Sequence, residues 1–116
     1  MSGALSYHAG LAAERQVALH YERAGMVICA RRWRGQSGEI DLIARDGAKV
    51  IFIEVKHSKT HANAAAHLSQ RQVQRIYMTA AEFVETEPMG QLTDVQLDAA
   101  LVDAQGKIQI LENFAA

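Results

Sequence analysis

The stretch from residue 38 to residue 56 constrains the fold of this chain most, because it has the pattern of two buried strands joined by a tight turn. Apolar residues, many of them β-branched, dominate the runs 40–44 and 50–55, as is typical of strands inside a sheet. The dipeptide Asp46-Gly47 separates the runs, and glycine adopts the positive φ of a two-residue hairpin loop at little cost. The sequence therefore predicts a β-hairpin whose loop is Asp46-Gly47.

Charged residues inside this hairpin conflict with its apolar character. The loop sets a register in which Asp41 lies opposite Phe52 and diagonal to Glu54. Because strand side chains alternate between two faces, one face then carries Phe52 together with Glu39, Asp41, Glu54 and Lys56. A buried charge is costly unless it is paired or binds a metal, and clustered carboxylates suit a hard cation such as Mg²⁺ or Mn²⁺. The alternative is that Glu54 and Lys56 only neutralise each other at a sheet edge.

The residues of this hairpin resemble a known nuclease signature. Asp41, followed on the next strand by the tripeptide E-V-K at 54–56, is similar to the D…E-x-K motif of the PD-(D/E)XK nuclease superfamily. More narrowly, GEIDLI at 38–43 and FIEVK at 52–56 resemble the YraN family. Members of that family are small bacterial proteins related to archaeal Holliday-junction resolvases.

The resemblance implies a metal-dependent endonuclease-like protein that acts on DNA, branched DNA included. Asp41 and Glu54 would bind Mg²⁺ or Mn²⁺, helped by the carbonyl of Val55. Lys56 would orient the attacking water or stabilise the charge that develops on the phosphate. Glu14, in a G-x-x-x-E pattern on the first helix, would be a further catalytic acid. A homodimer is expected by analogy with the resolvases.

Glu14 also stands out without the resemblance, because it lies in the apolar stripe of a predicted helix over 7–25. Three placements follow from that position. The side chain reaches solvent at the margin of the stripe, pairs with a buried base, or points at the carboxylates of the sheet. In the last case we expect Glu14 and Glu39 to be second-rank ligands or to anchor water.

The remaining segments predict an α/β fold in the order αβββαβ. Alternating and helical apolar patterns, separated by Gly, Pro and polar runs, predict a strand over 26–33, a loop over 57–64, a long helix over 65–84, and strands over 95–103 and 107–111. A mixed sheet flanked by helices, in one domain over residues 1–116, fits this order. It also matches the restriction-endonuclease-like core that the resemblance implies.

Basic residues gather in the middle of the chain, although the net charge is only −1. Residues 56–81 contain four basic groups, three histidines and no acid, whereas residues 82–116 contain seven acids and one lysine. Contacts with DNA phosphates are expected from Arg32, Arg34, Lys59, Arg71 and Arg75. Trp33, among the arginines, either stacks on a base or caps the core. The alternative for all these charges is an ordinary solvated surface.

Several classes of protein are not favoured by the sequence. The N-terminus lacks the apolar core of a signal peptide and no run reaches membrane-spanning length, so we expect a cytoplasmic protein without a membrane partner. Cys29 is the single cysteine, which leaves no internal disulfide, and its apolar surroundings predict burial.

Departures from the family pattern support a second hypothesis. Ser58 stands where the family tends to carry an arginine, and Q-L-D at 96–98 stands where it tends to carry R-F-D. These changes affect presumed substrate contacts and leave the metal-site residues intact. The alternative function is therefore a non-catalytic nucleic-acid- or protein-binding module of the same fold, or a structural dimer partner.

Overall fold

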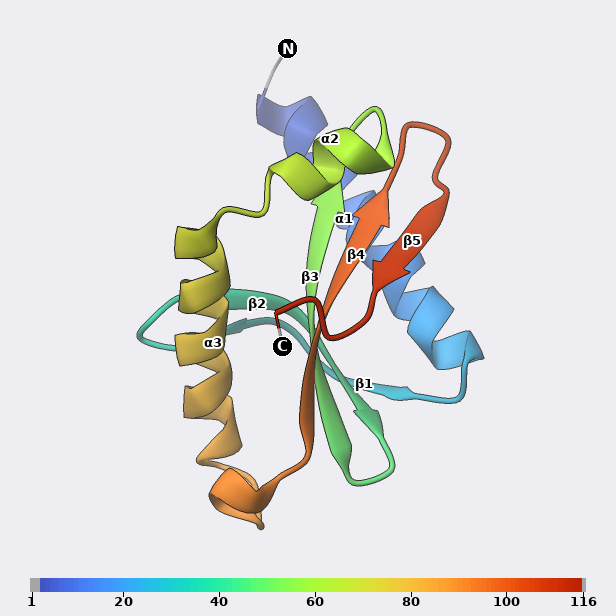
Figure 1. The fold of residues 1–116 in the computed structure, drawn as a ribbon. Coiled ribbons are helices and arrows are strands. Elements are labelled where there is room, and N and C mark those ends of the chain that lie inside the picture. Colours follow the sequence, from blue (N-terminus) through green and yellow to red (C-terminus); the bar gives the residue numbers. More distant parts are fainter. Residues whose placement is uncertain (1–2, 116) are drawn as a thin grey trace.

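A five-stranded mixed sheet forms the centre of the molecule (Figure 1). The computed structural model describes residues 3–115, with side chains from residue 8 onward. Its elements are α1 (Gly3–Arg23), β1 (Val27–Arg34), β2 (Glu39–Asp46), β3 (Lys49–His57), α2 (His61–Ala66), α3 (Gln70–Val84), the 3₁₀ helix η1 (Gly90–Leu92), β4 (Val95–Val102) and β5 (Ile108–Leu111). The strand order follows the chain, and only β3 and β4 run parallel. The predicted mixed sheet flanked by helices is confirmed, and the element order is compatible with an αβββαβ core.

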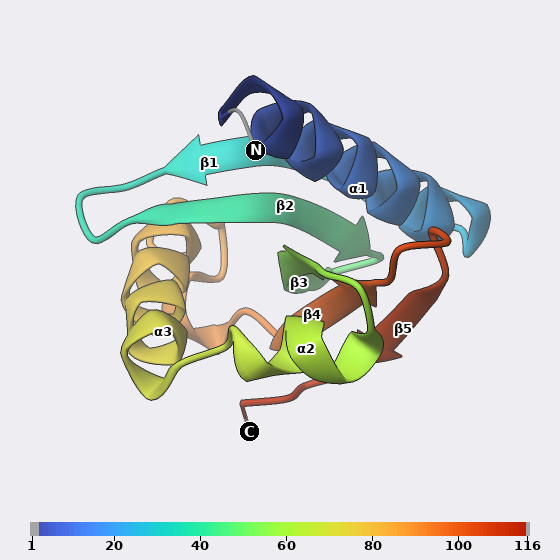
Figure 2. The same cartoon turned by 90° about the horizontal axis from the view of Figure 1, so that it is seen from above.

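Helices cover both faces of the sheet. Figure 2 shows α1 on one side of the sheet and α2 and α3 on the other. One core cluster packs Val17 of α1 with Leu42 and Ile53, all fully buried. The other packs Phe83 of α3 edge-on against Phe52, with ring centroids 5.7 Å apart. Burial of these apolar side chains fixes both helices on the sheet.

The β2–β3 hairpin forms where it was predicted, but its loop is displaced by one residue. Asp46 pairs with Lys49, so the two loop residues are Gly47 and Ala48. Gly47 has φ +60° at the first loop position, as in a type II′ turn, whereas the predicted loop would have placed it second. The displacement moves the register by two residues, so every opposite pair changes. The predicted pairing of Asp41 with Phe52 is therefore wrong. The faces also hold only in part, because Ile40 packs with Ile43 and Phe52 in one core cluster while Leu42 packs in the other, which breaks the alternation of β2 next to Asp41.

The segment after β3 is also more helical and more broken than predicted. The expected loop over 57–64 contains the start of α2, and the expected single helix over 65–84 is interrupted at 67–69. Thr60 caps α2 by accepting the Asn63 amide at 3.0 Å, and Ser69 caps α3 by accepting the Gln72 amide at 3.1 Å. Two N-caps thus divide what the apolar pattern suggested was one helix.

The edge strand β1 is irregular, and the prediction that Cys29 is buried is wrong. Ile28 pairs with Ala44 and Ala30 with Ile43, so Cys29 forms a bulge between them and is exposed. An apolar run on an edge strand does not bury every member. No helix in the part of the chain that the structure describes has the length and apolar content needed to cross a bilayer.

Candidate functional site

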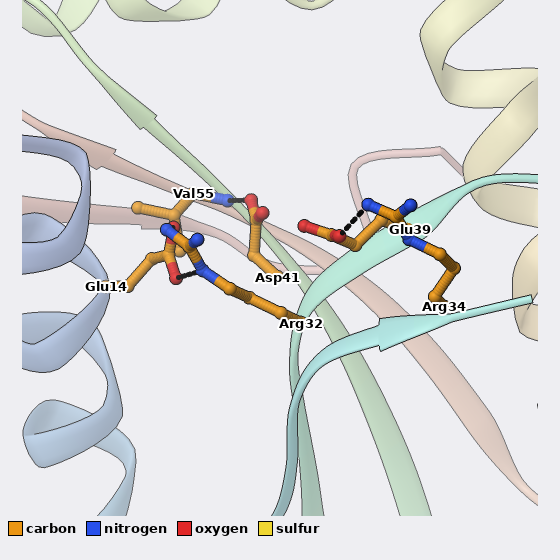
Figure 3. A network of polar contacts seen from close by, with 6 residues as sticks. All are labelled: Glu14, Arg32, Arg34, Glu39, Asp41 and Val55. Atoms are coloured by element: carbon orange, nitrogen blue, oxygen red, sulfur yellow. Dashed lines mark hydrogen bonds and ion pairs between the residues drawn. The ribbon is translucent and has the colours of Figure 1, made fainter. Parts of the chain in front are cut away.

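The candidate site forms where β2 and β3 stop pairing. Their antiparallel ladder ends at Leu42 opposite Ile53, after which β2 stays paired with β1 and β3 with β4. Asp41 and Glu54 are the next residues on the two strands. Asp41 Oδ2 accepts a hydrogen bond from the Val55 amide at 2.8 Å (Figure 3). The carboxylate of Asp41 therefore accepts the hydrogen bond of a β3 amide that the backbone of β2 no longer pairs with.

Burial makes this carboxylate pair unusual. Glu54 is only 7% exposed, and desolvation, followed by the charge of Asp41, raises its pKa to about 9. Desolvation also raises the pKa of Asp41, although hydrogen bonds with Glu54 and the Val55 amide act in the opposite direction. Without a cation, the two carboxyl groups therefore retain a proton at neutral pH.

Lys56 lies beside the pair but does not neutralise it fully. Its Nζ is 3.5 Å from Glu54 Oε1, so the expected ion pair between these two side chains forms. The pKa of Glu54 stays raised in spite of that pair, because burial and Asp41 outweigh the lysine. Simple neutralisation at a sheet edge therefore does not account for the second carboxylate.

The donor set fits a hard cation that keeps open positions. Two carboxylates, one of them bonded to the Val55 amide, offer oxygen ligands, which Mg²⁺ and Mn²⁺ prefer. Among the residues whose side chains are described, no group of three or more His, Cys, Asp or Glu is arranged to hold a metal. Mg²⁺ is commonly held by one or two carboxylates together with water and substrate phosphates, so a two-acid site is sufficient for it.

Helix α1 brings Glu14 to the edge of this site, where it pairs with Arg32 of β1. Arg32 Nε and Nη2 donate to the two carboxylate oxygens of Glu14 at 3.0 and 3.1 Å (Figure 3). The charge of Glu14 also contributes to the raised pKa of Asp41, so the two acids are close enough to interact. Of the three placements left open for Glu14, pairing with a base is the one that the structure shows.

Glu39 is paired with an arginine of β1 instead of joining the carboxylate pair, although the sequence predicts it on the same face (Figure 3). It lies opposite Arg34 on β1 and forms an ion pair with that residue, Nη2 to Oε2 at 3.0 Å. The side chain of Arg34 is 79% exposed, so this pair contributes little to stability. The prediction failed because β2 stops pairing with β3 at Leu42, so Glu39 has its partner on β1 instead.

The basic residues expected to contact phosphates are mostly exposed. Lys59 lies in the β3–α2 loop, and Arg71 and Arg75 lie one turn apart on α3. The stem of Arg75 covers Gly38, where a Cβ would lie 2.9 Å from its Cγ and Cδ. Arg75 is therefore held against the end of the β1–β2 loop, at the start of the strand that carries Asp41.

Two further residues shape this loop. Glu82 of α3 accepts the amides of Gln36 and Ser37 at 2.7 and 2.9 Å, and these bonds lower its pKa. Sequence reasoning missed Glu82, because nothing local shows which acid satisfies the two loop amides. Trp33 packs edge-on against Phe83, with centroids 5.3 Å apart, so it caps the core, one of the two placements left open.

Comparison with known proteins places these residues in a family. The family described as "Uncharacterised protein family UPF0102" matches residues 13–102, a range that includes the whole candidate site. A UPF0102 protein from Cereibacter sphaeroides (strain ATCC 17029) is 63% identical over 117 residues, with 100% of both chains covered. UPF0102 proteins from Roseobacter denitrificans and Ruegeria pomeroyi are 54% and 51% identical, and cover 97% and 96% of this chain and 87% and 90% of their own. The chain therefore belongs to the UPF0102 family.

Proposed function

We propose that this protein is a metal-dependent nuclease-like protein that acts on DNA phosphodiesters, with branched DNA among its substrates. The observation that carries the proposal is the buried pair of Asp41 and Glu54 at the fork between β2 and β3, with Lys56 beside it. A stable fold gains nothing from two carboxyl groups buried side by side in such a place, so a ligand is the simplest reason for them. The similarity of these residues to the PD-(D/E)XK signature and the YraN family supports the same proposal.

Each side chain of the site has a role in such a reaction. Asp41, Glu54 and the Val55 carbonyl would hold Mg²⁺ or Mn²⁺. When bound, the cation would lower the pKa of a water molecule and polarise the scissile phosphate. Lys56, with its ammonium 3.5 Å from Glu54, would orient the attacking water or stabilise the charge that develops on the phosphate. The expected product carries a 5′ phosphate.

The exposed bases next to the site would position the DNA. Arg34, Lys59, Arg71 and Arg75 offer charge to phosphates without reading a sequence. The β1–β2 loop is held to α3 through Glu82, so the arginines of the two elements keep fixed relative positions. A homodimer on two-fold symmetric DNA remains an expectation from the resolvase analogy.

A second candidate function is a non-catalytic binding module. Two observations favour it: the net charge of −1, and the lack of a third acidic, histidine or cysteine ligand at the site among the described side chains. Such a module would bind nucleic acid or protein and would need neither Lys56 nor a cation.

Cleavage and binding assays with one matched variant separate these functions. We would incubate the protein with single-stranded, duplex and four-way-junction DNA in Mg²⁺ or Mn²⁺. The nuclease proposal expects cleavage that Glu54→Gln abolishes while DNA affinity is kept. Binding without cleavage under all these conditions would support the binding module. Neither binding nor cleavage would remove both DNA-based functions.

A further inference from the structure

The backbone of Arg32 is strained in the middle of a strand. Its φ is +49°, and Asn113 is the one other non-glycine residue with a positive φ in the described part of the chain. Asparagine tolerates the left-handed region, whereas arginine has no such preference, and the conformation costs about 1–2 kcal/mol for an ordinary L-residue. Strain of this kind persists only where surrounding contacts hold it, and it is found preferentially at functional sites.

A double hydrogen bond to Glu14 holds the side chain of Arg32. The two bonds, 3.0 and 3.1 Å long, join β1 to α1. Arg31 pairs with Leu42 and Trp33 with Ile40, so by continuity Arg32 lies opposite Asp41. Figure 3 shows Arg32 and Glu14 next to Asp41. The strained residue thus places a guanidinium at the proposed cation site.

This ion pair is built so that a phosphate could replace the carboxylate. A guanidinium binds carboxylate and phosphate oxygens with the same two-pronged geometry. The side chain of Arg32 is 35% exposed, against 16% for Glu14, so an incoming anion reaches the arginine from solvent. In the free protein both carboxylate oxygens of Glu14 accept hydrogen bonds from Arg32, so they are not available to a cation.

We propose that Arg32 changes partners when substrate binds: it holds Glu14 in the free protein, and it releases Glu14 to the cation when a phosphodiester takes the guanidinium. The inference rests on the proposed function and adds to it a thermodynamic coupling between the binding of nucleic acid and the binding of the cation. Nucleic acid and divalent cation would each raise the affinity of the site for the other, by the same factor. Arg32 would bind substrate phosphate directly and also position Glu14.

The test measures Mn²⁺ affinity by calorimetry, and then the affinity for a phosphorothioate duplex, which resists cleavage, with and without Mn²⁺. Arg32→Asn removes the charge and keeps a residue that tolerates a positive φ, and Arg32→Gly serves as a second variant if the first folds poorly. Arg31→Asn, an exposed neighbour with the same loss of charge, is the matched control. Glu14→Gln and the double variant Arg32→Asn/Glu14→Gln complete a double-mutant cycle, which measures how far the two side chains act together.

In the wild type and in Arg31→Asn, Mn²⁺ should tighten duplex binding by about fivefold or more. Arg32→Asn should bind Mn²⁺ several-fold more tightly than Arg31→Asn in the absence of DNA, and should show a smaller effect of Mn²⁺ on duplex affinity. Glu14→Gln should also show a smaller effect of Mn²⁺ on duplex affinity, and should gain no Mn²⁺ affinity in the free protein. In the double variant, the gain in Mn²⁺ affinity should disappear.

Three results would overturn the inference: an Arg32→Asn variant that binds Mn²⁺ no more tightly than the control, a coupling in Glu14→Gln as large as in the wild type, or a gain in Mn²⁺ affinity that persists in the double variant. The last would show that loss of the arginine charge alone raises the affinity. A wild type that binds both ligands without coupling would remove only this inference. A wild type that binds neither Mn²⁺ nor the duplex would remove the proposed function with it.

Discussion

At the scale of single residues, Asp41 and Glu54 are destabilising where they stand unless a cation joins them. Asp41→Asn keeps an oxygen acceptor for the Val55 amide and removes one charge from the pair. In chelator, this change should raise the free energy of unfolding by about 0.5–2 kcal/mol. Added Mg²⁺ should stabilise the wild type by mass action and the variant much less. Thermal melting of both proteins, with and without metal, measures this. A variant that is destabilised in chelator, with a wild type that ignores millimolar Mg²⁺, would make Asp41 a structural residue.

The raised pKa of Glu54 predicts how stability depends on pH. Burial and the Asp41 charge raise this pKa from 4.5 to about 9, so between these values the folded state keeps a proton that the unfolded chain releases. In chelator, the free energy of unfolding should therefore fall as the pH rises from 6 to 8, by up to about 1.4 kcal/mol per pH unit. Glu54→Gln cannot titrate and should flatten this slope. Urea denaturation at three pH values measures it, and equal slopes in both proteins would contradict the account.

The pH range in which Glu54 changes the free energy of unfolding differs from the range in which other carboxyl groups do. Hydrogen bonds lower the pKa of Glu82, Glu87 and Asp103, so their stabilising contribution is lost only as the pH falls below the usual range of a carboxyl group. They leave the range from pH 6 to 8 unaffected. The difference in slope between the wild type and Glu54→Gln over that range therefore reports on the Asp41–Glu54 pair.

Part of this site could be predicted from the sequence. Alternation along β3 places Glu54 and Lys56 on one face whatever the loop register, and the two side chains form an ion pair. The approach of Asp41 does not follow from alternation, because Ile40 and Ile43 lie in one core cluster and Leu42 in the other. The partner of Glu14 could not be predicted. It depends on a positive φ at Arg32, which no local pattern indicates for an arginine.

At the scale of elements, the β1–β2 loop depends on a close approach to α3. A Cβ at Gly35 would lie 2.8 Å from Glu82 Oε1, the atom that accepts the Gln36 amide. Gly35→Ala should displace Glu82 and lower the free energy of unfolding. Gly10→Ala is the control, because nothing lies within 4 Å of its Cβ in α1 and the change should stabilise the helix by about 0.5–1 kcal/mol. Urea denaturation of both variants measures the difference, and a Gly35→Ala protein as stable as the wild type would show that Glu82 does not hold the loop.

The division between α2 and α3 shows what an apolar pattern misses. Six residues are too few to display helical periodicity, so the short helix α2 was predicted as a loop. The capping residues Thr60 and Ser69 were visible in the sequence, and each stands just before a helix. Greater weight on capping than on the apolar stripe would have found the break.

At the scale of the whole molecule, the order of strands and helices followed from the sequence because each long element carries its own apolar period. The arrangement of charge did not, since a net charge of −1 conceals a basic middle segment. That segment presents Arg71 and Arg75, both exposed on α3. Partners and oligomeric state depend on surfaces, and no local pattern specifies them.

This charge distribution predicts a salt-dependent DNA interface. Arg71→Glu and Arg75→Glu should each weaken DNA binding and reduce the salt slope by about one unit per lost phosphate contact. Arg23→Glu, at the last residue of α1, is the control with the same change of charge. Fluorescence anisotropy over a range of salt concentrations measures the slopes. Equal slopes in all three variants would place the binding face elsewhere.

The account depends most on the claim that Asp41 and Glu54 form a cation site. Crystals of the wild type and of Glu54→Gln, soaked in millimolar Mn²⁺, test it through anomalous difference density. We predict one peak between the carboxylate oxygens of Asp41 and Glu54 in the wild type, next to the Val55 carbonyl, and no peak in the variant. A wild-type site without a peak, with Lys56 still paired to Glu54, would contradict the claim and leave the binding module as the better account.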